Sequence, residues 1–501
     1  MPGGNFFVDA TADHPNKIFP STHPGHTASH TASLTASATR SLPDRYPNIP
    51  SSPATFVFGP RSNPDSVASH LYPRAMRLLL LTTLFSVPLL SLSAADWPQF
   101  RGPLGTGHAP GASPPLEWSE SRHIKWKTPI PHKGWSTPVV QGEVIWLTTA
   151  TEDGKEYFAL RLNRETGAVE QNVRLFSSEA PEPLGNNVNG YASSSPLIDG
   201  DLVFIHFGSY GTAALDARTG EEKWRRTDLP CRHYRGPGSS LAHFKNTLIL
   251  TMDGVDVQYL IALDKQTGRT VWKTDRTTDF KDIGPDGKPE LEGDLRKAYT
   301  TPLMIEPKTG EPWFISTGAK ATYAYDSATG QERWSALYDG FSNASSPVFA
   351  HGLVFINTGY GKANLHAYPV DDSTRGRLTS DQLAWDCLKR VPQRSTPVVV
   401  NNHLFMFDDG GFASCLDATT GEIKWSERLE GNFSSSPVVL QDGTILACTE
   451  QGASYALAPS ADAMTVLHTN TLETGMLAGP VAVEAALYLR TKSHLYRIEG
   501  E

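Results

Sequence analysis

The chain has 501 residues, 39% of them hydrophobic and 19% charged, and its 42 glycines and 37 prolines indicate many turns rather than long helices. Its net charge of −9 and its lack of basic runs argue against nucleic acid or an anionic membrane surface as a partner. The four cysteines form no CxxC pair, which argues against a zinc knuckle, a thioredoxin-type pair or haem attachment. Two disulfides or buried free thiols both remain open for Cys231, Cys387, Cys415 and Cys448.

Residues 1–75 are rich in Ser, Thr, Pro, His and Ala. Such a stretch cannot bury enough apolar surface to offset the entropy lost on ordering. We therefore expect it to be disordered.

Residues 76–95 have the parts of a secretory signal peptide. Arg77 supplies positive charge, Leu78–Leu92 form an apolar run, and Ser93 and Ala95 are small residues suited to cleavage. The apolar run is interrupted by Pro88 and is shorter than the roughly 20 residues of a membrane span.

The predicted signal peptide lies inside the chain rather than at its N-terminus, and two explanations account for this position. Translation starts at Met76 and residues 1–75 are a start-site error, or they are a cytoplasmic tail on an uncleaved anchor. We favour the first, which predicts a soluble mature protein of residues 96–501 in the periplasm or secreted, without a stable membrane anchor. No cysteine follows the apolar run, so a bacterial lipid anchor is not indicated.

An eleven-residue phrase, Ala-x-Asp-x-x-Thr-Gly-x-x-x-Trp, recurs along the rest of the chain. It occupies residues 214–224, 262–272 and 324–334, returns at 415–425 with Cys first, and has a weaker copy without the tryptophan at 162–167. The phrase predicts a hairpin, because Asp accepts bonds from turn amides and Gly adopts a left-handed conformation. Its tryptophan can pack against the next repeat.

A second phrase, two small hydroxyl residues and a proline, precedes each β-rich run. Its copies are residues 136–138, 194–196, 300–302, 345–347, 395–397 and 435–437, with degenerate copies at 239–241 and 478–480. Eight repeats with four short strands each predict an all-β, eight-bladed β-propeller of four-stranded blades.

The eighth unit ends one strand short, and residues 122–128 resemble a lone fourth strand. We therefore expect this N-terminal strand to close the last blade and remove an open edge. The alternatives are an open solenoid, or seven blades with an insertion.

The first phrase resembles the tryptophan-docking repeat of the PQQ-like (quinoprotein) β-propeller family. The opening Asp-Trp-Pro-Gln-Phe-Arg-Gly-Pro at 96–103 also resembles the mature N-termini of exported members of that family. The resemblance implies the fold but not the activity, because one fold hosts many functions.

Two branches of the family imply different functions. One comprises dehydrogenases that hold pyrroloquinoline quinone (PQQ) over Ca²⁺ and oxidise alcohols or sugars; their alcohol-oxidising members have adjacent cysteines, which this chain lacks. We assign no calcium ligands from spacing. The other branch is similar to the propeller of the outer-membrane barrel-assembly machinery, which binds partners and is usually a lipoprotein.

The resemblance favours a non-catalytic ligand- or protein-binding scaffold without a cofactor. A dehydrogenase that uses PQQ and Ca²⁺ is the alternative, and a carbohydrate-active propeller is a third. The Gly-rich segments 208–211 and 359–361 lie between strands without a following helix, so we interpret them as turns rather than phosphate loops.

The loops that lead into the innermost strands should meet at one mouth of the channel. Aromatic, cationic and amide groups there suit a protein or a small anionic or carbohydrate ligand. The candidate binding residues are Trp135, Tyr191, His233, Arg235, Lys297, Tyr299, Asn343, Arg394 and Phe433. The alternative is that these are ordinary polar loops. We predict no catalytic or metal-ligating residue.

Overall fold

The computed structural model describes residues 96–185, 188–307 and 310–500. The chain divides into two units, Met1–Val87 and Pro88–Glu501, and all described residues belong to the second. The predicted extension at 1–75 and the predicted signal peptide at 76–95 lie outside the described residues.

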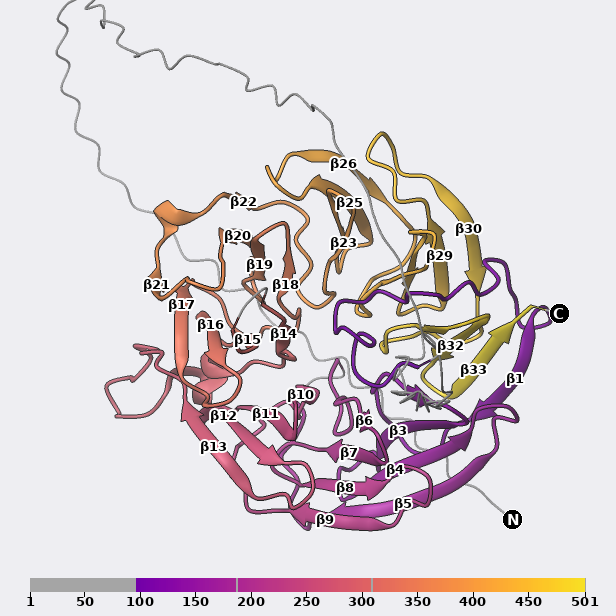
Figure 1. Ribbon diagram of the computed structural model, residues 1–501, viewed down its shortest axis with the longest axis horizontal. Helices are drawn as coiled ribbons and strands as arrows, with labels where there is room; N and C mark the ends of the chain where they lie inside the picture. The colour runs from indigo at the N-terminus through magenta and orange to yellow at the C-terminus, as the bar shows by residue number, and fades with distance from the viewer. Residues whose placement is uncertain (1–95, 186–187, 308–309, 501) are drawn as a thin grey trace, which may run out of the picture. The chain divides into compact units, whose positions relative to one another are not determined.

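Eight sheets follow one another around a central channel, which confirms the predicted eight-bladed propeller (Figure 1). In each blade, strands A to D run from the channel outwards. Blades 1 to 3 are β2 (Val139–Gln141), β3 (Val144–Ala150), β4 (Glu156–Asn163) and β5 (Val169–Ser177); β6 (Leu197–Asp199), β7 (Leu202–His206), β8 (Thr212–Asp216) and β9 (Glu222–Arg226); and β10 (Ala242–Phe244), β11 (Thr247–Asp253), β12 (Gln258–Asp264) and β13 (Thr270–Asp275).

The remaining blades follow the same order. Blades 4 to 6 are β14 (Leu303–Ile305), β15 (Trp313–Thr317), β16 (Ala321–Asp326) and β17 (Glu332–Leu337); β18 (Val348–Ala350), β19 (Leu353–Asn357), β20 (Leu365–Pro369) and β22 (Trp385–Cys387); and β23 (Val398–Val400), β24 (His403–Phe407), β25 (Phe412–Asp417) and β26 (Ile423–Arg428). Blades 7 and 8 are β27 (Val438–Val439), β28 (Ile445–Cys448), β29 (Ala453–Leu457) and β30 (Val466–Thr471); and β31 (Val481–Val483), β32 (Ala486–Arg490), β33 (His494–Glu499) and β1 (Ile124–Pro129).

Burial along the strands follows their place in the blade. The B and C strands are buried almost throughout, as in β15 and β32, because neighbouring blades pack on both of their faces. The outer D strands are more exposed than the B and C strands, and β13 buries only Trp272.

The turn between strands C and D explains the repeated phrase. Asp216 Oδ1 accepts hydrogen bonds from the amides of Arg218 and Thr219, at 3.1 and 2.8 Å, and Gly220 adopts a φ of +73°. The Gly of the turn also makes room for a tryptophan of the preceding blade. A Cβ at Gly268 would lie 2.7 Å from the ring of Trp224.

The same tryptophans connect one blade to the next. Trp224 Nε1 donates to the carbonyl oxygen of Lys265 at 2.8 Å, and Trp272 Nε1 donates to that of Ser327 at 3.3 Å. Blade 1, which lacks the tryptophan, uses Gln171, whose amide donates to the carbonyl oxygen of Thr219.

Blade 5 departs from the repeat between its C and D strands. The intervening segment contains a short 3₁₀ helix, η2 (Ser380–Gln382), and β21 (Gly376–Leu378), which pairs in parallel with β17 as a fifth strand of blade 4. After η2, Trp385 occupies the position of the repeat tryptophan in blade 5, and its Nε1 donates to the carbonyl oxygen of Ala418 in blade 6.

A second 3₁₀ segment, η1 (Glu290–Arg296), lies between β13 of blade 3 and β14 of blade 4.

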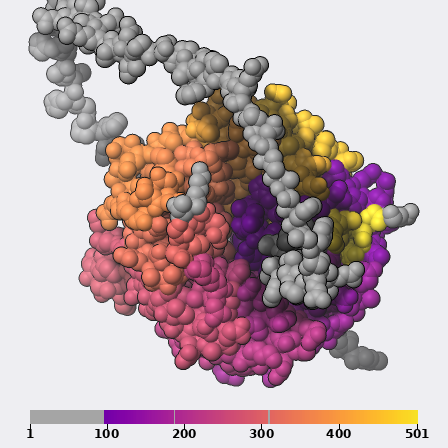
Figure 2. Space-filling model, in the orientation of Figure 1, coloured from indigo at the N-terminus to yellow at the C-terminus, as the bar shows by residue number. Residues whose placement is uncertain are grey.

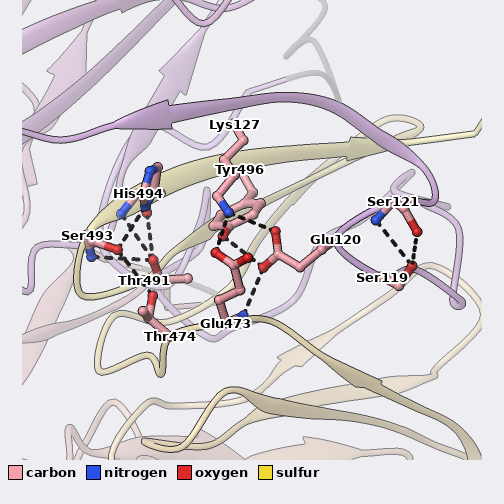
Figure 3. Close-up of polar contacts among 10 residues, drawn as sticks. All are labelled: Ser119, Glu120, Ser121, Lys127, Glu473, Thr474, Thr491, Ser493, His494 and Tyr496. Carbon is pink, nitrogen blue, oxygen red and sulfur yellow. Dashed lines mark hydrogen bonds and ion pairs between the residues drawn. The ribbon is translucent and has the colours of Figure 1, made fainter.

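The ring closes through β1, which pairs antiparallel with β33 and confirms the predicted closing strand. Figure 3 shows a polar network at this seam. Lys127 Nζ donates to Glu120 at 2.9 Å and to Glu473 at 2.7 Å, and it lies 5.2 Å from the centre of the Tyr496 ring. The Tyr496 hydroxyl donates to Glu120 as well, at 3.0 Å.

The segment before β1, residues 96–121, runs from the inner strands outwards, and its indigo ribbon begins near the centre of the ring and reaches the rim (Figures 1 and 2). Near its end, the amide of Trp118 donates to Asn470 of the outer strand β30 at 2.8 Å. Trp97 exchanges two backbone hydrogen bonds with Val140 of β2, and Pro98 accepts one from Ile198 of β6. Further along, Ala109 donates to Val439 of β27. One continuous segment therefore bridges the innermost strands of blades 1, 2 and 7.

Candidate binding site

The loops that lead into the A strands meet at one mouth of the channel and line a cavity of about 530 Å³, which we call the mouth cavity. Every blade contributes to its wall, and Phe100 of the N-terminal segment contributes as well. This volume lies in the range of ligand-binding pockets.

Aromatic rings form much of the wall of the mouth cavity. Phe100, Trp135, Tyr299, Phe341 and Tyr360 line it. The rings of Phe341 and Tyr360 meet edge to face with their centres 6.0 Å apart, and Tyr360 remains 59% exposed. Such rings offer apolar contact area at little cost in side-chain entropy, which suits recognition of a partner.

The charged groups of the wall are paired. Arg235 Nε lies 3.1 Å from Asp294, across the boundary of blades 3 and 4. Arg394 contacts Asp409 and also lies 3.0 Å from Glu450. These ion pairs hold the two guanidinium groups at fixed positions on the wall.

A belt of hydroxyl groups surrounds the channel beneath the wall. The second residue of each small-hydroxyl phrase accepts a hydrogen bond from the backbone amide of its counterpart in the preceding blade, at distances of 2.9 to 3.3 Å. We call these seven hydroxyl residues the hydroxyl belt: Thr137, Ser195, Ser240, Thr301, Ser346, Thr396 and Ser436.

The hydroxyl belt has one gap. Blade 8 has Gly479 at the corresponding position, and its amide donates to Thr137 Oγ1 at 3.3 Å. Among the described residues, the amide of Ser436 has no hydrogen-bond partner, because Gly479 has no hydroxyl to accept from it. Thr137, Thr301, Ser436 and Gly479 all line the mouth cavity.

The structure brings four of the nine predicted residues together. Trp135, Arg235, Tyr299 and Arg394 line the mouth cavity, although they come from four different blades. They remain candidates for contact with a ligand.

The other five predicted residues are buried and are not part of the cavity lining. The Tyr191 ring meets Tyr157 edge to face, and its hydroxyl donates to the carbonyl oxygen of Glu182 at 2.7 Å. Asn343 donates to the carbonyl oxygen of Asn357 at 2.9 Å, and Phe433 packs against Phe407 in the core of blades 6 and 7.

His233 and Lys297 form a buried polar cluster between blades 3 and 4. Lys297 Nζ lies 3.1 Å from His233 Nδ1 and donates to the carbonyl oxygen of Asp253 at 3.1 Å. His233 Nε2 accepts from the amide of Ser209 at 3.0 Å. Burial, and then the charge of Lys297, lower the pKa of His233, and burial lowers the pKa of Lys297. These contacts connect the loops behind the wall.

Several wall residues were absent from the sequence prediction. Phe100 and Asp294 lie outside the repeat phrases, so no internal copy indicated their place. Tyr360 lies in the Gly-rich turn of blade 5, where the flanking glycines marked a turn but not a contact residue. The regular spacing of the small-hydroxyl phrase was the signal that could have revealed the hydroxyl belt.

The residues of the wall do not suit a calcium-bound quinone. Ca²⁺ takes six to eight oxygen ligands. The two carboxylates that line the mouth cavity, Asp294 and Asp409, each contact an arginine. Within residues 96–185, 188–307 and 310–500, no group of three or more His, Cys, Asp and Glu side chains could hold a metal ion.

The four cysteines are all buried and unpaired. Across the described parts of the chain, no helix has both the length and the apolar character required to cross a membrane.

Comparison with known proteins relates most of the chain to one family. A family model described as outer membrane protein assembly factor BamB matches residues 117–229 and 256–499. The protein of that name from Burkholderia pseudomallei (strain K96243) is 22% identical over 327 residues, which cover 64% of this chain and 77% of the relative. The one from Yersinia pestis is 23% identical over 198 residues, 39% of this chain and 46% of that protein.

Solved structures share the fold at low sequence identity. A europium-containing methanol dehydrogenase superimposes with a TM-score of 0.55 at 12% identity, covering 81% of this chain and 98% of that one. At this identity the likeness concerns the architecture alone.

Proposed function

The chain belongs to the family of the outer membrane protein assembly factor BamB, and on this premise we propose that it is a non-catalytic scaffold that binds a protein partner at the mouth cavity. The relatives carry the name of a factor that assembles outer membrane proteins, and we propose a partner of that class for this chain.

The observation that carries the proposal is the composition of the mouth cavity. All eight blades contribute to it, and its wall combines five aromatic rings with two arginines held by carboxylates. Aromatic residues and arginine are enriched at the energetically dominant positions of protein interfaces. The C–D turns, in contrast, repeat nearly the same residues from blade to blade, as packing between blades requires.

We further propose that the protein is exported and acts in the periplasm with Asp96 as its first residue. The proposal is supported by contacts of the first described residues with the propeller, because Asp96 Oδ1 accepts from the amide of Gly142 and Trp97 pairs with Val140. N-terminal sequencing of the protein from its native host tests it. Recovery of a form that retains residues 1–75 would contradict it.

Site-specific photo-crosslinking in the native host tests the binding proposal. A photoreactive residue at position 360, on the exposed rim of the mouth cavity, should give discrete protein adducts. The matched control carries it at position 467 of β30, an outer strand where the native leucine is 42% exposed. Identical adducts at both positions, or no adduct at 360, would contradict the proposal.

A second experiment separates the scaffold from a dehydrogenase. After incubation with PQQ and Ca²⁺ and then gel filtration, a scaffold should carry neither the quinone chromophore nor bound calcium. Quinone that elutes with the protein and supports oxidation of an alcohol or a sugar would overturn the proposed function.

A further inference from the structure

The hydroxyl belt has unused hydrogen-bond donors. Each of its seven oxygens accepts an amide hydrogen, and within the described residues none of the seven hydroxyl groups donates to an acceptor. Thr137 and Thr301 are 3% and 8% exposed and line the mouth cavity. A hydroxyl proton that finds no acceptor in a buried place favours a ligand that brings one.

Two buried arginines near the channel have no carboxylate partner among the described residues. Arg490 donates to the carbonyl oxygens of Ser136 and Thr148, at 2.8 and 3.0 Å. Arg101 donates to those of Thr106 and Pro397, and its Nη1 has no partner. Burial lowers the pKa of both groups to about 9, so both remain charged at neutral pH. Two positive charges are therefore left without a neighbouring counter-charge.

Both arginines contact residues that adjoin the belt in the sequence. Arg490 Nη1 donates to Ser136 Oγ at 2.5 Å, and Ser136 directly precedes Thr137 of the belt. Arg101 Nη2 donates to the carbonyl oxygen of Pro397 at 3.1 Å, and Pro397 directly follows Thr396 of the belt. The arginines of the wall differ, since Arg235 and Arg394 are each neutralised by acidic side chains.

We call the part of the mouth cavity lined by Thr137, Thr301 and Ser436 of the belt its base. We infer that this base binds an oxyanion group, the carboxylate of a polypeptide or an inorganic oxyanion. The unused hydroxyl donors of Thr137, Thr301 and Ser436 line the cavity and favour a ligand rich in acceptors. The two uncompensated guanidinium groups do not line it, but their charge favours a negative ligand over a sugar hydroxyl or an amide. The polypeptide source rests on the proposed function, whereas the oxyanion chemistry does not. The aromatic wall would then contact the groups next to the carboxylate.

Calorimetric titration of the full-length protein tests this inference with a matched pair of probes. N-acetylphenylalanine carries an aromatic ring and a carboxylate, and N-acetylphenylalaninamide is its neutral counterpart. The acid should bind at least about ten-fold more tightly than the amide, as expected for hydrogen bonds to a charged group. Equal binding of both, or no heat with the acid up to its solubility limit, would overturn the inference.

Substitution of the belt gives a second, independent measurement. Thr137→Val removes the hydroxyl at similar volume, whereas Thr137→Ser keeps it. The amide of Gly479 lies 3.3 Å from this hydroxyl, at the long end of the belt's distances, so its loss should be tolerated by the fold. The valine variant should bind the acid about ten-fold more weakly and the serine variant like the wild type. If Thr137→Val lowers the Tm clearly, Thr301→Val is used in its place. Wild-type affinity for the acid in a folded valine variant would overturn the inference.

Competition with inorganic phosphate identifies the source of the oxyanion. Displacement of the acid by phosphate assigns the base of the cavity to an inorganic oxyanion, and resistance to phosphate assigns it to a polypeptide carboxylate. Two outcomes distinguish this inference from the proposed function. Protein crosslinks at position 360 together with equal binding of the acid and the amide would support the proposed function and contradict this inference. Tighter binding of the acid without any crosslinked protein would support this inference and contradict the proposed function.

Discussion

Trp126 Nε1 donates a 3.1 Å hydrogen bond to the carbonyl oxygen of Arg164, which joins the last strand of blade 8 to the C–D turn of blade 1. A Cβ at Gly167 would lie 2.5 Å from the same indole ring. The contact repeats the tryptophan contacts inside the ring, although here the two blades come from opposite ends of the propeller sequence. The seam is therefore built like the other boundaries between blades.

Removal of this closing contact should destabilise the ring. Deletion of residues 122–128 exposes the edge of β33, and we expect aggregation or a clear fall in Tm. Trp126→Ala should lower the free energy of unfolding by about 2–3 kcal/mol, less than for a fully buried tryptophan. Lys125→Ala on the same strand is the control, with a change within about 0.5 kcal/mol. An unchanged, monomeric melt of the deletion variant would mean that the ring closes in another way.

Filling the gap in the hydroxyl belt should stabilise the protein. Gly479→Ser offers an acceptor to the amide of Ser436, and a Cβ there would meet only ordinary contacts, 3.4 Å or more away. Gly479→Ala is the matched control, because it reduces the entropy of the unfolded chain without adding a hydroxyl. The serine variant should exceed the alanine variant by about 0.5–1 kcal/mol in denaturant unfolding. Equal stability of the two would show that the added hydroxyl does not join the belt.

Stability should fall between pH 7 and pH 5. Burial lowers the pKa of His206 from its ordinary 6.5 to about 4, and it lowers the pKa of His233 as well. In this range the unfolded chain binds more protons than the folded one, so acidification favours unfolding. His206 alone should contribute about 2 kcal/mol at pH 5.

Urea unfolding at both pH values measures this loss, and His206→Gln should reduce it. The same free energy of unfolding at pH 7 and pH 5 would contradict the assignment of a neutral, buried His206.

The thiols should be inert in the folded protein. All four cysteines are buried and unpaired, and burial raises the pKa of Cys415 to about 12 and that of Cys448 to about 11. A thiol reagent at pH 8 should label none of them in native protein and all four after unfolding. Reducing agent should leave the Tm unchanged, and a fall in Tm would point to a disulfide.

The architecture could be predicted because its main contacts are local and repeated. The Asp, Gly and Trp of the C–D turn recur at fixed spacing, and each has a physical role in the same hairpin. The C–D connection of blade 5 was not predicted, because an insertion separates β20 from Trp385 and interrupts that spacing. The strand it adds to blade 4 depends on pairing between distant residues, which no local pattern records.

The candidate site could be predicted only in part. Its location followed from the topology, since the loops before the A strands share one mouth. Which side chains reach the cavity depends on their register in the loop. Trp135, Tyr299 and Arg394 each lie two residues before the second residue of their small-hydroxyl phrase, and all three line the cavity. Trp135 lines the cavity, while Tyr191 is anchored behind it by the carbonyl of Glu182. Tyr191 lies four residues before Ser195 and is out of this register, whereas Arg235 reaches the cavity from five residues before Ser240, which the repeat does not indicate.

The affinity of the partner captured at position 360 tests the central claim most directly. The mouth variant carries Trp135→Ala, Arg235→Ala and Arg394→Ala, and the control carries Val271→Ala, Ile423→Ala and Leu467→Ala on outer strands. A folded mouth variant should bind at least about ten-fold more weakly, and the control should bind like the wild type. Equal affinity of the wild type and the folded mouth variant would contradict a binding site at the mouth of this propeller.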